Sequence, residues 1–180
     1  MNTLLTIFGI IAGIVVVVLI VAAVAPKDYN VQRSIIINKP RQEVFAYIKY
    51  LRNQDNYNKW VMTDPNKRMT YRGTDGTEGF ASAWDSDIKQ AGKGEQTIKK
   101  IIEGERIDLQ VVFIKPFAGI ADTYMATQSV TSNSTSVKWN FDSRMSYPMN
   151  IVLLFINMDK MMGADMDTSL NNLKSVLEKQ

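Results

Sequence analysis

The chain has 180 residues and a formal net charge of +3, from 21 lysines and arginines against 18 aspartates and glutamates. A surplus this small, with its basic residues scattered, argues against a nucleic-acid partner. The sequence contains no histidine and no cysteine, which excludes Ser-His-Asp catalysis, histidine-ligated metals, thiolate nucleophiles and disulfides. The one acidic, oxygen-rich loop, TDGTEG at residues 74–79, has too few ligands for a calcium site. We therefore expect no metal and no cofactor.

The first segment, Leu4–Ala25, carries no charge. As a helix it would be about 33 Å long, which matches a hydrocarbon core of about 30 Å. The sequence therefore predicts a transmembrane anchor over residues 1–27 and a second domain over residues 28–180. Two alternatives stay open. One is a cleaved signal peptide, for which Ala23–Ala25 supplies a small-residue site, and the other is a buried core helix, although such helices rarely contain so long an apolar run.

Positive charge follows this segment, whereas only the α-amino group precedes it. The basic residues that come next are Lys27, Arg33, Lys39 and Arg41. By the positive-inside rule, we expect a single-pass protein of the inner or cytoplasmic membrane, with its second domain on the cytoplasmic side. Within the segment, Gly9 and Gly13 form a small-xxx-small pair that would permit weak self-association, although glycine is common in such helices.

Residues 29–38 (YNVQRSIIIN) form a β-branched run that predicts a strand. Pro40 then suits the first turn of a helix. The apolar face of that helix repeats at a period of about 3.6 and comprises Val44, Phe45, Ile48 and Leu51. The polar stretch that follows, RNQDNYNKW, ends at Trp60 and predicts a short second helix or a loop.

From about residue 67 to residue 142 the apolar period changes to two, which predicts strands. Turn signals at residues 73–76, 103–104 and 131–134 join these strands in pairs. In the last of them Val137, Trp139 and Phe141 share one face, opposite polar side chains. One apolar and one polar face are typical of an antiparallel sheet that is covered on a single side. With the strand at residues 29–38, the prediction is seven strands.

After Tyr147-Pro148 the stretch MNIVLLFINMDKMM is apolar but too short to span a bilayer. Its first part, within SYPMNIVLLF, could instead form a gate that dips into the bilayer surface. Gly163 predicts a break, after which a helix carries an apolar stripe of Met166, Leu170, Leu173 and Leu177. The order of elements predicts an α+β fold, in which a curved seven-stranded antiparallel sheet wraps on a long C-terminal helix.

This order, together with the segments RSIIINKPRQEVFAYI, YRGTDGTEGFASAW, GKGEQTIKKIIEGERID and SLNNLKSVLEK, resembles the polyketide cyclase/dehydrase branch of the START-like superfamily over residues 29–179. The resemblance implies the helix-grip fold, which lipid-transfer domains and the birch-pollen allergen share. It also implies a deep apolar cavity between the sheet and the C-terminal helix that holds a hydrophobic ligand. Enzymatic members commonly place ionisable residues in this cavity, and the sequence offers no matching set.

Candidates for the cavity lining are inward-facing apolar residues of the strands and methionines near the C-terminal helix. Most of the ten methionines fall between residues 145 and 166, and methionine suits a wall that must refit around varied ligands. Ordinary core packing explains the same residues equally well. The expected lining comprises Trp84, Leu109, Val111, Phe113, Tyr124, Trp139, Phe141, Met145, Met149, Met162 and Met166.

The sequence leaves three functions open. The first is membrane-anchored, non-enzymatic binding of a hydrophobic small molecule or lipid. The second is a cyclase/dehydrase-type enzyme acting on a polyketide-like substrate through Asp122 and Tyr124, which would require burial to raise the pKa of Asp122. An exposed aspartate is the better expectation on such a strand. The third is a regulatory module that binds a membrane protein through the glycine pair or a sheet edge.

Overall fold

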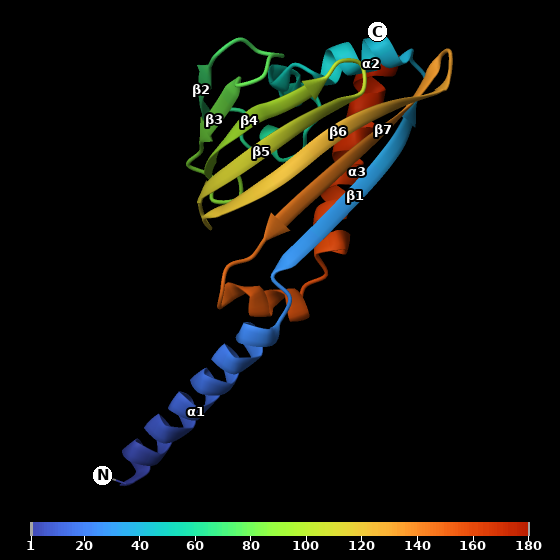
Figure 1. The fold of residues 1–180 in the computed structure, drawn as a ribbon. Helices are drawn as coiled ribbons and strands as arrows, with labels where there is room; N and C mark the ends of the chain where they lie inside the picture. The colour runs from blue at the N-terminus through green and yellow to red at the C-terminus, as the bar shows by residue number, and fades with distance from the viewer. Residues whose placement is uncertain (1, 180) are drawn as a thin grey trace.

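A computed structural model of the protein describes residues 2–179. Figure 1 shows an N-terminal helix, α1 (Asn2–Val24), that projects from one end of a twisted antiparallel sheet, with helix α3 (Met158–Glu178) packed against one face of that sheet. The seven strands follow the spatial order β1-β7-β6-β5-β4-β3-β2. Their bounds are β1 (Asp28–Ile37), β2 (Arg68–Arg72), β3 (Ala81–Asp85), β4 (Lys93–Ile102), β5 (Arg106–Lys115), β6 (Gly119–Thr131) and β7 (Ser134–Arg144). This is the helix-grip fold, as the sequence predicts.

Short helical elements complete the layer that covers the inner face of the sheet. They are α2 (Arg41–Ile48) and the 3₁₀ turns η1 (Leu51–Asn56) and η2 (Val61–Thr63), while a third 3₁₀ turn, η3 (Met149–Leu154), lies beside the end of α1. Strand periodicity sends alternate side chains to the core, so Val137 and Trp139 are buried whereas Lys138 is exposed. The apolar stripe of α3 meets this face through Met166 and Leu170.

Helix α3 passes through Gly163 without interruption, so the predicted break is wrong. The glycine instead admits a side chain from β1, because a Cβ at this position would lie 1.8 Å from Arg33 Nη2. The Arg33 guanidinium donates to Asp159 Oδ1 at 2.7 Å and to Asp167 Oδ2 at 3.1 Å. The hydrogen bond from Arg33 lowers the pKa of Asp159. Close approach of β1 and α3 therefore explains a residue that local helix propensity disfavours.

The TDGTEG loop positions η1. Asp75 Oδ1 accepts a hydrogen bond from Leu51 N at 2.9 Å, and Asp75 Oδ2 accepts one from Arg52 N at 3.2 Å. These bonds satisfy amides at the start of a helical turn, which have no partner within the turn itself. Strands β2 and β3 are joined through residues 73–80, a longer connection than the tight turn predicted at residues 73–76.

Gly92 lies where the β3–β4 connection meets the turn between β5 and β6. Its φ is +63°, and a Cβ here would lie 2.1 Å from the carbonyl oxygen of Lys115. We expect Gly92→Ala to lower the free energy of unfolding by about 2–4 kcal/mol, because it adds backbone strain and overlap with a carbonyl group that cannot move independently. Urea denaturation of the full chain in detergent micelles, followed by tryptophan fluorescence, measures this loss.

Gly104→Ala is the matched control for this prediction. Gly104 also has a positive φ, +75°, but no described atom lies within 4 Å of a Cβ placed there. The control should therefore cost only about 1 kcal/mol, from the backbone conformation alone. Equal losses in the two variants would show that the approach of Lys115 does not matter.

Helix α1 is joined to the domain by a buried polar side chain. Asn150 of η3 is fully buried, and its Nδ2 donates to the carbonyl oxygens of Ala22 at 2.7 Å, Ala25 at 3.2 Å and Pro26 at 3.4 Å. Carbonyl groups at the end of a helix have no partner within the helix, so Asn150 caps α1 from outside. Its Oδ1 is a buried atom without a hydrogen-bond partner among the described residues.

The rest of α1 extends away from the sheet. Thr3–Val24 has a mean hydropathy of 3.3 and the length needed to cross a membrane, a combination that an anchor and a signal segment both satisfy. Only 6% of this helix is buried within the protein. Helix α1 is therefore not a core helix, and that alternative is wrong.

Candidate functional site

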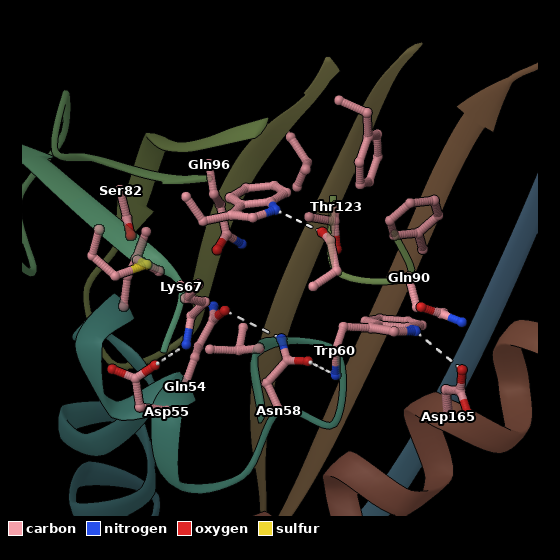
Figure 2. Close-up of a pocket in the computed structure, with 18 of the residues that line it drawn as sticks. Gln54, Asp55, Asn58, Trp60, Lys67, Ser82, Gln90, Gln96, Thr123 and Asp165 are labelled. Carbon is pink, nitrogen blue, oxygen red and sulfur yellow. Dashed lines mark hydrogen bonds and ion pairs between the residues drawn. The ribbon is translucent and has the colours of Figure 1, made fainter. Parts of the chain in front are cut away.

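A cavity of about 440 Å³ lies between the inner face of the sheet and the covering elements η1, η2 and α3. Small-molecule sites in proteins typically occupy about 300–1,000 Å³. Strands β2 to β7 contribute one wall, and the segment from Leu51 to Lys67 contributes the opposite one. Figure 2 shows lining side chains from both walls.

Aromatic rings form a continuous apolar wall in this cavity. The ring centroids of Trp84 and Phe113 are 6.2 Å apart, and those of Phe113 and Phe141 are 6.5 Å apart. Trp60 lies against Phe141 at 6.4 Å and against Trp139 at 5.6 Å. All three tryptophans of the chain therefore line the cavity. Offset and edge-on arrangements of this kind stabilise a rigid wall that offers a large apolar surface.

The polar atoms of all three tryptophan rings are paired within the protein, and that of Trp84 donates to the carbonyl oxygen of Ala91 at 2.9 Å. Trp139 Nε1 donates to Thr123 Oγ1 at 2.9 Å, and that hydroxyl donates to the carbonyl oxygen of Asn140 at 2.5 Å. Trp60 Nε1 donates to Asp165 Oδ2 at 3.1 Å, as Figure 2 shows. Because these donors are satisfied, this part of the cavity presents hydrocarbon surface to a ligand.

The 3₁₀ turn η1 and the loop after it bring a second, polar part to the cavity. Asn58 Nδ2 donates to Gln54 Oε1 at 3.2 Å, and Asn58 Oδ1 accepts from Trp60 N at 3.1 Å. Lys67 Nζ lies 3.2 Å from Asp55 Oδ1, so the charge of Lys67 is neutralised. Hydrogen bonds therefore hold this irregular segment in one conformation against the sheet.

Strand register places one opening of the cavity near α1. The turn between β5 and β6 lies at the end of the sheet where β1 begins, because Asp28 pairs with Arg144 and Ala121 pairs with Ser143. The exposed lining residues at this end form what we call the cavity mouth: Gln90, Lys115, Pro116, Phe117 and Met161. Phe117 is 71% exposed, although it is a large apolar residue.

At the opposite end the cavity is lined by Arg52 and Tyr71, and both residues are exposed. Tyr71 and Ser82 are cross-strand partners near the end of β2, and the Arg52 guanidinium carbon lies 4.2 Å from the centroid of the Tyr71 ring. Burial raises the pKa of Tyr71, with a further contribution from Asp55. The Tyr71 phenol is therefore a weaker acid than usual and unsuited to donating a proton at neutral pH.

The predicted lining residues divide into two groups. Those that line the cavity are Trp84, Val111, Phe113, Trp139, Phe141 and Met162. Leu109 and Met166 do not line it, because they are packed into the core. Met145 and Met149 also lie outside it, at the end of β7 and in η3, where the chain has left the inner face of the sheet.

Asp122 and Tyr124 lie on the outer face of β6. Ala121 and Thr123 of the same strand face the interior, so strand periodicity sends the residues at positions 122 and 124 outward. Asp122 is exposed and accepts a hydrogen bond from Gln110 Nε2 at 3.1 Å. The Arg106 guanidinium covers the Tyr124 ring at 3.8 Å. Neither residue lines the cavity. For Asp122 this is the exposed position that the sequence favours, whereas Tyr124 lies outside the lining that the sequence predicts.

Sequence reasoning missed the polar half of the cavity. Gln54, Asn58 and Lys67 belong to a segment without apolar periodicity, and no local signal shows which of its side chains face inward. Ser82 and Gln96 could have been found, because they share the inward parity of Trp84 and Ile98 on their strands. Within residues 2–179, no three aspartate or glutamate side chains gather in a way that could hold a metal ion.

No family model matches the chain, and no curated protein sequence is similar to it. Solved structures share its fold. Norcoclaurine synthase from Thalictrum flavum has a TM-score of 0.64 at 7% identity, over 87% of this chain and 98% of that protein. A Thermobifida fusca protein has a TM-score of 0.60 at 12% identity, with coverages of 83% and 93%. Ara h 8.0201 has a TM-score of 0.54 at 10% identity, with coverages of 85% and 99%.

At identities this low the similarity shows the fold alone. The neighbours therefore support the helix-grip fold, and they do not test the resemblance to the cyclase/dehydrase branch. Norcoclaurine synthase has been solved in complex with dopamine and hydroxybenzaldehyde.

Proposed function

We propose that this protein is a membrane-anchored binding domain that holds a hydrophobic small molecule or lipid in its cavity. The observation that carries the proposal is the cavity of about 440 Å³, with its aromatic wall and its mouth at the end of the domain nearest α1. Transfer of apolar surface from water to such a wall is favourable by about 25 cal/mol per Å². Burial of apolar surface would therefore be sufficient to drive binding, and the proposed function requires no catalytic group.

The anchor is supported by the way α1 joins the domain. Asn150 bonds the end of α1 to η3, and residues on both sides of it in the sequence form an exposed apolar surface, which we call the η3 surface. It comprises Met149, Leu154, Phe155 and Ile156. Phe155 is 82% exposed, and exposed patches of this kind mark contact sites for proteins or membranes. With α1 in a bilayer, the η3 surface would rest on the lipid beside it, on the cytoplasmic side.

The mouth and the anchor together suggest how the site would be loaded. A molecule dissolved in the bilayer would reach the mouth between Phe117 and Met161 without crossing much water. Tethering raises the effective concentration of the domain at the membrane, so the affinity for the ligand itself can be modest.

Detergent-free extraction of the full chain in polymer-bounded lipid particles tests this function. We expect native mass spectrometry to find about one apolar molecule per chain, distinct from the lipids of particles that lack the protein. The same spectra should show a chain that retains residues 1–27. An empty cavity would contradict the binding function, and a mature chain that starts at Pro26 would contradict the anchor.

The alternatives have less support. The cyclase/dehydrase-type enzyme would need a proton-transfer group in the cavity other than Asp122 and Tyr124, which lie outside it. Association with a second copy or with a membrane protein through Gly9 and Gly13 stays a prediction, and no described atom lies within 4 Å of a Cβ placed at either glycine.

A further inference from the structure

The connections between strands differ in character at the two ends of the sheet. At the end from which α1 projects, residues 116–118 between β5 and β6 read PFA, and residues 86–92 between β3 and β4 read SDIKQAG. At the opposite end, the turn at residues 103–105 reads EGE and the turn at residues 132–133 reads SN. The connections near α1 therefore contain large apolar residues, whereas these two turns at the far end are polar.

The hairpin formed by β5 and β6 is apolar and exposed at this end. Phe117 in its turn is 71% exposed, and Ile114 and Ile120 on either side are 50% and 55% exposed. Both isoleucines lie on the outer face of the sheet, which is polar further along the same strands at Gln110 and Asp122. Outward positions of an antiparallel sheet usually carry polar side chains. The change to isoleucine near α1 therefore indicates that something other than water covers this end.

Tertiary contacts bring this hairpin close to the C-terminal end of α1. Ser143 Oγ donates to the carbonyl oxygen of Ile120 at 2.8 Å, and Ser143 pairs with Tyr29, which follows α1 closely in the chain. The β3–β4 connection packs on the same hairpin at Gly92, and its Ile88 is 41% exposed. Figure 1 shows the β5–β6 turn and η3 at the end of the domain from which α1 projects. Three apolar segments therefore lie at this end: the η3 surface, the β5–β6 turn and the β3–β4 connection.

Lysines without ion pairs accompany these apolar segments. Within residues 2–179 none of them lies within ion-pair distance of a carboxylate, and they are Lys27, Lys89, Lys115 and Lys160. Three aspartates of the same segments are paired with arginines, as Asp28–Arg144, Asp87–Arg68 and Asp159–Arg33. Asp122 and Asp142 have no cationic partner among the described residues, but they lie on the outer face of the sheet and not on a connection. The excess of positive charge at this end favours an anionic partner.

We infer that this end of the domain docks on an anionic phospholipid surface, into which Phe117 inserts while Lys89 and Lys115 meet the phosphate groups. The inference rests on the anchor of the proposed function and adds a second point of attachment, at the β5–β6 turn. A bilayer is the partner that α1 brings to this end of the domain, and aromatic and basic side chains are both favoured at its interface. Attachment at two points would hold the cavity mouth, which includes Phe117 and Met161, against the lipid.

Site-directed spin labelling tests this inference, because the chain has no cysteine of its own. A nitroxide is attached to Phe117→Cys in the full chain, in nanodiscs of phosphatidylcholine and phosphatidylglycerol. We expect this label to collide more often with oxygen, which concentrates in lipid, than with a water-soluble nickel complex. Val130→Cys is the matched control, since Val130 is an apolar residue, 53% exposed, near the opposite end of β6. Its label should collide more often with the nickel complex.

The role of the lysines is tested in the same preparation. Lys115→Gln should lower the ratio of lipid-protected to water-exposed label at position 117 by about fivefold, which corresponds to about 1 kcal/mol for one lysine at an anionic surface. Lys138→Gln is the control, because Lys138 is exposed on the outer face of β7, away from this end. It should leave the ratio unchanged. The same ratio in nanodiscs of phosphatidylcholine alone would overturn the preference for anionic lipid.

A third label, on Val15→Cys within α1, separates failure of the inference from failure of the anchor. If this label is in lipid while the label at position 117 stays in water, the inference fails and the anchor stands. If the label at position 15 is itself in water, the anchor and the inference fail together. Equal protection at positions 117 and 130 would show that the label adsorbs without specificity, and it would also overturn the inference. Occupancy of the cavity is measured separately, by native mass spectrometry.

Discussion

Val111→Trp is expected to abolish most binding of hydrophobic molecules while the domain stays folded. Val111 lies on the inner face of β5, lines the cavity and pairs with Gln96 and Ala121 of the neighbouring strands. An indole at this position would extend into space that a ligand would otherwise fill. We expect affinity for dodecan-1-ol to fall by about 10- to 100-fold, equivalent to about 1.4–2.8 kcal/mol. Occupancy measured by native mass spectrometry avoids interference from the added tryptophan.

The adjacent residue supplies the matched control. Val112 is on the outer face of the same strand and is exposed, so Val112→Trp adds the same side chain without entering the cavity. Its ligand occupancy should equal that of the wild type. Binding that survives Val111→Trp, or falls equally in both variants, would show that the ligand sits elsewhere.

The second large effect is expected at the joint between α1 and the domain. Asn150→Ala removes the one side-chain donor shared by the carbonyl oxygens of Ala22, Ala25 and Pro26. Leaving such groups unsatisfied costs about 1–3 kcal/mol. Hydrogen exchange in residues 145–157 should therefore accelerate by about 10- to 100-fold in nanodiscs, whereas exchange in the central strands should change little.

Asn133→Ala is the corresponding control, because Asn133 is exposed in the turn between β6 and β7. It should not alter exchange near η3. Asn150→Asp should be worse than Asn150→Ala, since a carboxylate would face three carbonyl oxygens in a buried site. Unchanged exchange in both Asn150 variants would mean that other contacts hold the joint.

Local patterns were sufficient to predict the framework of the fold. Alternation along β7 follows from burial on one face, and the stripe of Met166, Leu170 and Leu173 on α3 follows from helical periodicity. Local patterns do not account for Gly163. Position 163 is a glycine because Arg33, which is distant in sequence, packs against it. Local helix propensity carries no information about that contact.

The candidate site was only partly predictable for the same reason. Trp84, Phe113 and Phe141 follow from strand parity, whereas Tyr124 is aromatic but lies at a position whose parity points outward. Gln54 is brought to the cavity by η1, whose position depends on hydrogen bonds that its backbone amides donate to Asp75, which is distant in sequence. A polar residue in an irregular segment therefore gains its role only from tertiary structure.

The joint between α1 and the sheet has a mechanical consequence. Only residues 25–27 separate α1 from β1, and the bond between Asn150 and Ala22 stiffens that short connection. A flexible linker lets a domain sample many orientations, but here rotation of the helix about its long axis must carry the sheet round with it. In two copies whose α1 helices pack side by side, the two cavities would consequently lie at one fixed angle to each other. The face of α1 that makes the contact would determine that angle.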